Sequence, residues 1–511
     1  MKSRPGKPQY YGKLAKIGLL WGFLREGTNF LLQLPTAIIL ARLLTPHEFG
    51  VTAAAYFFLQ LCNRLTQFGF GVALVRTPHI TKEHLGSVFL LNLALATVAW
   101  ITLTVGAPVL GGFLRSPETA AVLPTVALGF FIVAFGTVPT ALLSRDMRFR
   151  DSSTSDWFDT VTCSVVTILL AWNGFSYWSV VYGTLAGDAM RAIVRTVMAR
   201  HLPTLRWSRA AIQEIFGFGS GIYIKNLLDY SVQNLDNLIV GRMIGMTALG
   251  FYDKAYSTMA RVITKINLSG PNVSFRIFAL IHDQPERFRA AYRKVIMSVT
   301  LVGYAVFTGM MVTAPELIQV LYGTRWLPAV VPFQLLCVAA MMRLLNTYAS
   351  SATQAKGQIW SEVRRQTLFT ILLVAAVALM SRWGIAGAAG GVLIATSVMT
   401  VMLQRLIRQL SGLTWHDMLR PQVPGVVCAV GLAAVAWGIK LALRAAFPGA
   451  GAAIVLFTCA LACAVYFLGF VLIGPFVEIR KIVHESLQDL APGLAKQVTW
   501  LAPASEEAPA L

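Results

Sequence analysis

Long apolar segments recur along the whole of this 511-residue chain. The hydrocarbon core of a bilayer is about 30 Å thick, so a helix needs on the order of 20 mainly apolar residues to cross it. Hydrophobic residues make up 56% of the sequence and charged residues 13%, whereas roughly 25% of residues are charged in soluble domains. The sequence therefore predicts an all-α polytopic membrane protein.

We expect about fourteen transmembrane helices, as two six-helix lobes followed by an appended pair. The expected spans lie at roughly 17–40, 50–74, 86–111, 120–143, 157–174, 177–198, 214–241, 248–270, 291–320, 329–352, 364–383, 386–407, 422–446 and 450–475. The expected parts are a basic N-terminal tail, an N-lobe, an inter-lobe linker, a C-lobe, the appended pair and a C-terminal tail, at 1–16, 17–198, 199–213, 214–408, 409–476 and 477–511.

A stripe of polar side chains crosses the apolar stretch 214–252. Its members fall at i, i+4, i+8 and i+11, which is one face of a 3.6-residue helix. They are Lys225, Asp229, Gln233 and Asp236. Ionisable residues at membrane depth cost several kcal/mol unless they face a wet cavity or each other. This stripe therefore indicates a helix that lines a polar path.

The same polar pattern occurs 200 residues earlier in the chain. Arg25, Asn29, Gln33 and Thr36 correspond without a gap to the four members of the stripe, and the register continues through Gly50 and Gly250. We infer an internal duplication of a membrane unit. Because six spans are an even number, both copies would enter the membrane from the same side, related by a pseudo-twofold axis along the membrane normal.

The basic residues predict that both termini are cytoplasmic. Alternate loops that share a side with the N-terminal tail carry most of the lysines and arginines, and we assign Arg191 and Arg195 to this set. The opposite side holds far fewer basic residues, namely Arg42, Arg115, Arg242, Arg325, Arg382, Lys440 and Arg444. The formal net charge of +20 then follows from the positive-inside rule and attraction to anionic lipid, and no nucleic-acid partner is expected.

Motifs of enzyme chemistry are absent from the sequence. There is no P-loop, HExxH or GxSxG pattern. The six cysteines fall within apolar spans without a CxxC pair, so free core cysteines are expected rather than a disulfide framework or a metal site. We expect a protein that is not an enzyme and that holds no cofactor.

Four stretches of the chain resemble one family of transporters. The first is TAIILARLLTPHEFGVTAAAYFFLQLCNRLTQFGFGVALVR at 36–76, and the others are NLDNLIVGRMIGMTALGFYDKAYS at 234–257, HDQPERFRAAYRK at 282–294 and APELIQVLYGTRWLPAV at 314–330. Together they resemble the Wzx-like polysaccharide and O-antigen repeat-unit flippases. These form the polysaccharide transporter branch of the multidrug/oligosaccharidyl-lipid/polysaccharide exporter superfamily.

The resemblance implies a bacterial inner-membrane flippase that works by alternating access. Its substrate would be an undecaprenyl-pyrophosphate-linked oligosaccharide of lipopolysaccharide, O-antigen or exopolysaccharide synthesis, moved from the cytoplasmic to the periplasmic leaflet. Membrane lipid, polysaccharide polymerase and chain-length machinery are the partners that it suggests.

Each part of such a substrate matches a group of residues in the predicted path. Two cations facing one cavity suit a diphosphate, because Arg binds phosphate oxygens bidentately and Lys acts as a point charge; these are Arg25 and Lys225. Groups that hydrogen-bond to sugars would be Asn29, Gln33, Gln233 and Asn234. Asp229 and Asp236 are candidates for ion coupling, and Asp229 is equally suited to neutralise Lys225. Further cations that would extend the basic path are Arg64, Lys254, Arg261, Lys265 and Arg343.

Other interpretations remain open for these residues and for the chain. Arg25 has the alternative of snorkelling to the interface, as have the cations of the extended basic path, and Trp326 is expected at the membrane interface. A cation-coupled multidrug antiporter of the same superfamily would need a mostly acidic cavity, which Arg25 and Lys225 argue against. A peptidoglycan lipid-linked precursor flippase shares the demand for cations. A non-transporting scaffold of a polysaccharide synthase complex would not depend on the buried stripe.

Overall fold

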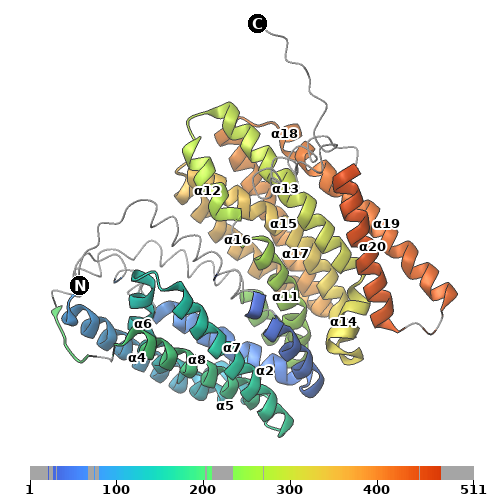
Figure 1. Ribbon diagram of the computed structural model, residues 1–511. Helices are drawn as coiled ribbons and strands as arrows, with labels where there is room; N and C mark the ends of the chain where they lie inside the picture. The colour runs from blue at the N-terminus through green and yellow to red at the C-terminus, as the bar shows by residue number, and fades with distance from the viewer. Residues whose placement is uncertain are drawn as a thin grey trace. The chain divides into compact units, whose positions relative to one another are not determined.

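Every regular element in the described part of the chain is helical (Figure 1). The computed structural model describes residues 27–29, 31–66, 80–201, 204–209, 234–268, 270–447 and 451–473, together with residues 21, 74 and 449. The chain divides into two compact units. The first comprises Met1–Asp253 with Ser381–Ile385, and the second comprises Lys254–Met380 with Ala386–Leu511.

The helices of the N-terminal half are α2 (Pro46–Thr66), α4 (Lys82–Leu114), α5 (Pro117–Val126), α6 (Gly129–Arg145), α7 (Phe149–Trp172) and α8 (Trp178–Ala199). Residues 31–43 and 234–243 are also helical. The later helices are α11 (Met246–Ile266), α12 (Gly270–Leu280), α13 (Pro285–Val312), α14 (Ala314–Tyr322), α15 (Val330–Ala355), α16 (Ile359–Met380), α17 (Gly384–Ser411), α18 (Trp415–Leu419), α19 (Val423–Ala446) and α20 (Ala452–Ile473). Short 3₁₀ turns are η1 (Thr324–Ala329), η2 (Ser381–Trp383) and η3 (Arg420–Gln422).

Seven helical stretches among the described residues are long and apolar enough to cross a membrane. They lie in both halves of the chain and include the appended pair at Trp415–Ala446 and Ala452–Ile473. The prediction of an all-helical polytopic membrane protein is therefore confirmed, whereas the finer count of about fourteen spans stays a prediction.

The expected span 291–320 is interrupted. Helix α13 ends at Val312, and α14 begins at Ala314 with Pro315 in its first turn. Proline lacks a backbone N–H and clashes with the preceding turn, so it is tolerated in a first turn and ends the helix before it. Pro315 therefore marks a helix boundary inside the stretch that hydrophobicity alone predicts as one span.

Two glycines bring α7 and α8 into close contact in the first unit. A Cβ atom at Gly187 would lie 2.5 Å from Oδ1 of Asp159 and 2.8 Å from Cβ of Cys163, and one at Gly183 would overlap Oγ1 of Thr167. The two glycines are spaced as Gly-x-x-x-Gly, the spacing that lets membrane helices approach each other closely. Because Gly183 and Gly187 carry no side chain, α7 and α8 can pack closely at these positions.

A second pair of glycines makes a reciprocal contact in the first unit. A Cβ atom at Gly50 would overlap the carbonyl oxygen of Met246, and one at Gly250 would overlap that of Pro46. Residues 46 and 246, like 50 and 250, are 200 positions apart. Reciprocal contacts between equivalent positions are typical of a twofold arrangement, so this crossing supports the predicted duplication.

In the second unit, a buried ion pair joins α14 to α19. Nζ of Lys440 lies 2.8 Å from a carboxylate oxygen of Glu316 and also donates to the carbonyl of Val312 at 3.0 Å. Both ionic side chains are buried, and the more exposed Arg444 approaches the same carboxylate at 3.3 Å. The first helix of the appended pair is thereby held to α14 by charge as well as by packing.

Replacing Gly187 with leucine should destabilise the chain. The new side chain would collide with Asp159 and Cys163, and overpacking costs about 1–3 kcal/mol. We expect a lower midpoint of thermal unfolding for purified Gly187→Leu in detergent. Gly112→Leu is the matched control, because nothing lies within 4 Å of a Cβ atom there. Equal midpoints for the two variants would contradict the proposed role of Gly187.

Removing one partner of the Glu316–Lys440 pair should lower the stability of the folded chain more than removing both partners. Glu316→Leu leaves the Lys440 ammonium buried without its carboxylate, which costs about 3–5 kcal/mol for buried pairs. The double variant Glu316→Leu/Lys440→Met replaces the pair with apolar groups, and we expect it to recover most of the lost thermal stability. A double variant no more stable than Glu316→Leu would show that the pair does not stabilise the contact.

Candidate functional site

The predicted diphosphate-binding pair, Arg25 and Lys225, lies outside the described residues. The same holds for Asp229 and Gln233, and Arg64 belongs to α2 with its side chain outside the description. The roles assigned to these five residues therefore stay predictions.

Asn29 contacts α7. The hydroxyl of Thr160 donates to Oδ1 of Asn29 at 3.2 Å, whereas the side chain of Gln33 is exposed. Asn29 thus contacts the face of α7 that also carries Asp156, one turn before Thr160.

A network of charged side chains joins α6, α7 and α8 next to this contact. The guanidinium of Arg195 donates to Asp156 at 2.6 Å, to Ser155 at 3.0 Å and to Thr140 at 2.8 Å. The side chains of Arg195 and Asp156 are 17% and 19% exposed. Three partners from two helices hold this arginine inside the first unit. Arg195 therefore has internal partners, which the positive-inside pattern by itself does not predict.

The second arginine of the network bridges two carboxylates. Nη1 of Arg191 lies 2.6 Å from Asp159 on α7, and Nη2 contacts Asp188 on α8. The network thus combines three carboxylates with two guanidinium groups. These ionic groups are half-buried between helices, where paired charges replace part of the lost contact with water.

Sequence reasoning missed this network, although a signal for it was present. Asp188, Arg191 and Arg195 fall at i, i+3 and i+7, which is one helix face, and Asp156 and Asp159 fall at i and i+3 on α7. Both arginines also fit the positive-inside bias, which by itself predicts no partner for them. An acidic partner stripe on the neighbouring apolar segment would have indicated an internal network.

Asp236 is fully buried in the first unit, and its carboxylate accepts a hydrogen bond from the hydroxyl of Tyr252 at 2.7 Å. The partner lies on α11, 16 residues later in the chain. The neighbouring Asn234 is half-buried. Tyr252 is therefore a partner of Asp236 that the spacing of the polar stripe did not predict.

An aromatic cage surrounds the ammonium group of Lys254 in the second unit. Nζ lies 5.5 Å from the ring centroid of Tyr322 and 5.9 Å from that of Trp326, distances typical of cation–π contacts. Thr258 and the Tyr322 hydroxyl share a hydrogen bond of 2.7 Å beside it. Trp326 is 0% exposed, so the expectation of an interfacial tryptophan was wrong: its ring covers a buried cation instead.

Exposure rises along the basic face of α11. Lys254 is buried, Arg261 is half-buried and Lys265 is exposed. Arg343 on α15 is half-buried and donates to the hydroxyl of Tyr256 at 2.7 Å, with its guanidinium 5.2 Å from the centroid of that ring. Lys254 and Arg343 are thus both held by aromatic side chains of their own unit.

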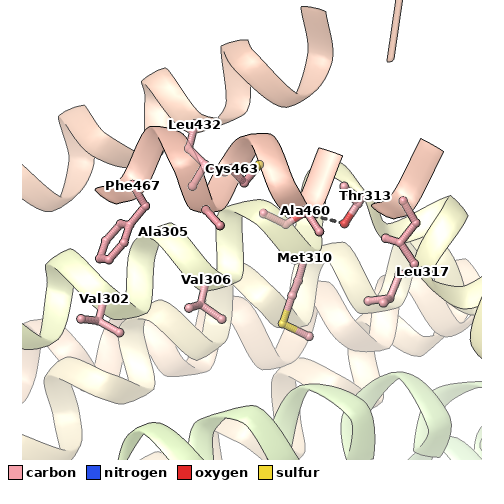
Figure 2. Close-up of a pocket in the computed structure, with 13 residues that line it drawn as sticks. Val302, Ala305, Val306, Met310, Thr313, Leu317, Leu432, Ala460, Cys463 and Phe467 are labelled. Atoms are coloured by element: carbon pink, nitrogen blue, oxygen red, sulfur yellow. Dashed lines mark hydrogen bonds between the residues drawn. The ribbon is translucent and has the colours of Figure 1, made fainter. Parts of the chain in front are cut away.

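The second unit also contains an apolar pocket of about 340 Å³ beside the appended pair. Figure 2 shows side chains of α13, among them Val302, Val306 and Met310, near those of α20, with Leu432 of α19 close by. Of the residues that line it, Thr313 has a hydroxyl, and this donates to the carbonyl of Gly309 at 2.7 Å. The pocket can accommodate hydrocarbon and offers little to a polar group.

Comparisons with known proteins agree with this fold. Residues 39–331 match a family described as "Polysaccharide biosynthesis protein". The chain is 24% identical over 382 residues to lipopolysaccharide biosynthesis protein WzxC of Escherichia coli (strain K12), covering 73% of this chain and 76% of that protein. It is 27% identical over 321 residues to succinoglycan biosynthesis transport protein ExoT of Rhizobium meliloti (strain 1021), covering 62% and 65%.

A solved structure of the lipid II flippase MurJ, in an inward closed conformation, matches with a TM-score of 0.67. The match covers 92% of this chain and 99% of that one at 12% identity, so it shows the fold alone. Fold and family define a class: a multi-pass membrane transporter of the multidrug/oligosaccharidyl-lipid/polysaccharide exporter superfamily, and not an enzyme. Within this class, the chain belongs to the polysaccharide biosynthesis family of Wzx-like transporters.

The cage around Lys254 should appear as a coupling energy between Lys254 and Trp326. A double-mutant cycle with Lys254→Met and Trp326→Leu should give a coupling in the free energy of unfolding of about 0.5–2 kcal/mol. The matched cycle of Lys254→Met with Trp360→Leu should be additive, because Trp360 is 81% exposed. Additive behaviour in both cycles would contradict the cation–π contact.

Proposed function

We propose that this chain is a flippase for undecaprenyl-pyrophosphate-linked oligosaccharide repeat units. It would move them from the cytoplasmic to the periplasmic leaflet of a bacterial inner membrane, for lipopolysaccharide, O-antigen or exopolysaccharide synthesis. The observation that carries the proposal is the duplicated polar stripe, with one cation in each copy, in a member of the polysaccharide biosynthesis family. The names of the relatives WzxC and ExoT place those proteins in lipopolysaccharide and succinoglycan biosynthesis.

The diphosphate of such a substrate requires fixed cations. A bare diphosphate cannot cross hydrocarbon, and Arg25 and Lys225 would bind it from the two copies of the stripe. Asn29, Gln33, Gln233 and Asn234 would bind sugar hydroxyls, since amide side chains both donate and accept hydrogen bonds. Asp229 and Asp236 remain the candidates for ion coupling.

The lipid tail of the substrate needs no polar path. It can stay in the bilayer while the head group crosses, and the apolar pocket between α13 and α20 offers it a protein surface (Figure 2). Hydrocarbon in this pocket would make van der Waals contacts, because a lipid tail that stays in the bilayer is already out of water. In this proposal one protein separates the hydrophilic and hydrophobic parts of its cargo.

Alternating access of two six-helix lobes would carry the head group across. The lobes would be related by a pseudo-twofold axis along the membrane normal, with the appended pair outside them and both termini in the cytoplasm. The reciprocal crossing at Gly50 and Gly250 supports the duplicated arrangement. The paired charges of the α6–α7–α8 network would keep the first lobe rigid as it moves.

The rival functions make different demands on the same residues. A cation-coupled multidrug antiporter would need a mostly acidic cavity, in conflict with Arg25 and Lys225. A peptidoglycan precursor flippase has the same chemistry at the diphosphate, and the likeness to MurJ concerns the fold. A scaffold of a synthase complex would tolerate neutral residues throughout the stripe.

Complementation of a polysaccharide-flippase null strain tests this proposal. Wild type should restore polymer at the cell surface, and Arg25→Ala or Lys225→Ala should abolish it at matched membrane levels, because each removes a cation from the diphosphate site. Arg42→Ala is the matched control: this arginine lies near the end of the helix at 31–43 and is exposed, so polymer should be retained. Full rescue by both cavity variants would refute the cation pair, and failure of properly inserted wild type across several polymer backgrounds would refute the function.

A further inference from the structure

Helix α12 is a short additional element between two longer helices, α11 and α13. The preceding α11 has 21 residues, which at 1.5 Å per residue is about 31 Å, enough to cross the hydrocarbon core. The following α13 begins at Pro285 and contains a candidate span of its own. The 11 residues of α12 are therefore not needed for crossing the membrane.

The contacts of α12 place it at the ends of its neighbours. Ser351 donates to the carbonyl of Pro271 at 3.3 Å, and Ser351 lies close to the end of α15 at Ala355. Phe278 packs on Phe288, with ring centroids 5.3 Å apart, and Phe288 lies in the first turn of α13. The start of α13 and the end of α15 belong to one membrane face, because the two helices form an antiparallel pair. Helix α12 lies at that face.

One side of α12 is buried and the other exposes apolar side chains. Ser274 and Phe278 are 5% and 0% exposed, whereas Val273, Ile277 and Leu280 are 51%, 41% and 82% exposed. At 100° per residue, these three side chains fall within an arc of about 60°, and Phe275, which is 40% exposed, lies outside it. Water would be an unfavourable environment for this face.

Basic residues outnumber the exposed acidic Asp283 and Glu286 on α12 and on the segments next to it. Arg276 points from the same side of α12 and is exposed, as are Arg287 and Lys294 in the first turns of α13. Lys356, just after α15, lies with Nζ 4.6 Å from the ring centroid of Phe288. An apolar arc with adjoining cations is typical of helices that lie in the headgroup region of an acidic membrane.

We propose that α12 is an interfacial helix that binds acidic phospholipid in the leaflet where the basic loops lie. Val273, Ile277 and Leu280 insert among the acyl chains, and Arg276 extends to a lipid phosphate. The buried Phe278 and the Ser351–Pro271 hydrogen bond hold the helix against α13 and α15 in this orientation. The inference depends on the membrane location of the protein and not on its transported substrate.

Spin labels on the full chain test the depth of α12. In a variant with all six cysteines replaced by alanine, labels at residues 277 and 280 in phosphatidylethanolamine–phosphatidylglycerol bilayers should be accessible to oxygen and protected from a water-soluble nickel complex. A label at the exposed Asp283 is the control and should be accessible to nickel. Nickel accessibility at 277 and 280 equal to that at 283 would overturn the proposal and favour a soluble protein partner for this face.

A second measurement keeps the native cysteines and tests the lipid contact itself. A photoreactive amino acid at residue 280 should form adducts with phospholipid, read by mass spectrometry, with phosphatidylglycerol enriched over its share of the bilayer. Arg276→Gln should reduce that enrichment about fivefold, the factor for about 1 kcal/mol per cation near an anionic surface. Adducts without phosphatidylglycerol enrichment in wild type would refute acidic-lipid binding.

Discussion

An ionised side chain within a membrane protein needs a partner, because hydrocarbon does not solvate charge. The described helices meet this requirement in three ways. Arg195 and Arg191 engage carboxylates of α7 and α8, Glu316 neutralises Lys440, and the ammonium of Lys254 lies over two aromatic rings. Each solution joins different helices, so the arrangement of helices and the arrangement of charges depend on each other.

Small residues make the ionic contacts of the first unit geometrically possible. Gly187 lies against Asp159, the carboxylate that Arg191 contacts. A larger residue at this position would separate α7 from α8 and lengthen the ion pairs between them. Backbone proximity and charge pairing are thus two parts of one helix interface, in which close packing supplies the dispersion contacts and the ion pairs select the register.

The chemistry of the proposed substrate accounts for the variety of surfaces in one chain. A lipid-linked oligosaccharide combines a diphosphate, sugars and a long hydrocarbon tail. In the proposed function, the polar stripe would receive the diphosphate and sugars, the apolar pocket beside the appended pair would receive the tail, and helix α12 would contact the surrounding bilayer. A protein of this family needs no catalytic group, because translocation breaks no covalent bond of its cargo.

Much of the fold and some of the site followed from the sequence by itself. Segment length and hydrophobicity determined the polytopic helical class, and four stretches together resembled the family to which the chain belongs. The offset of 200 residues predicted a duplication, which the reciprocal contact of Gly50 and Gly250 supports. These properties can be read from the sequence because they depend on local composition and periodicity.

Only the tertiary structure decided which polar side chains meet. Arg195 and Asp156 are 39 residues apart in the chain, and Lys254 is caged by residues more than 60 positions later. Periodicity assigns a side chain to a face of its helix, but the partner of that face depends on how the helices cross. For this reason the sequence identified Lys254 as an intramembrane cation but did not identify Trp326 as its partner. In the fold, the buried ring of Trp326 covers the Lys254 ammonium group instead of facing the membrane interface.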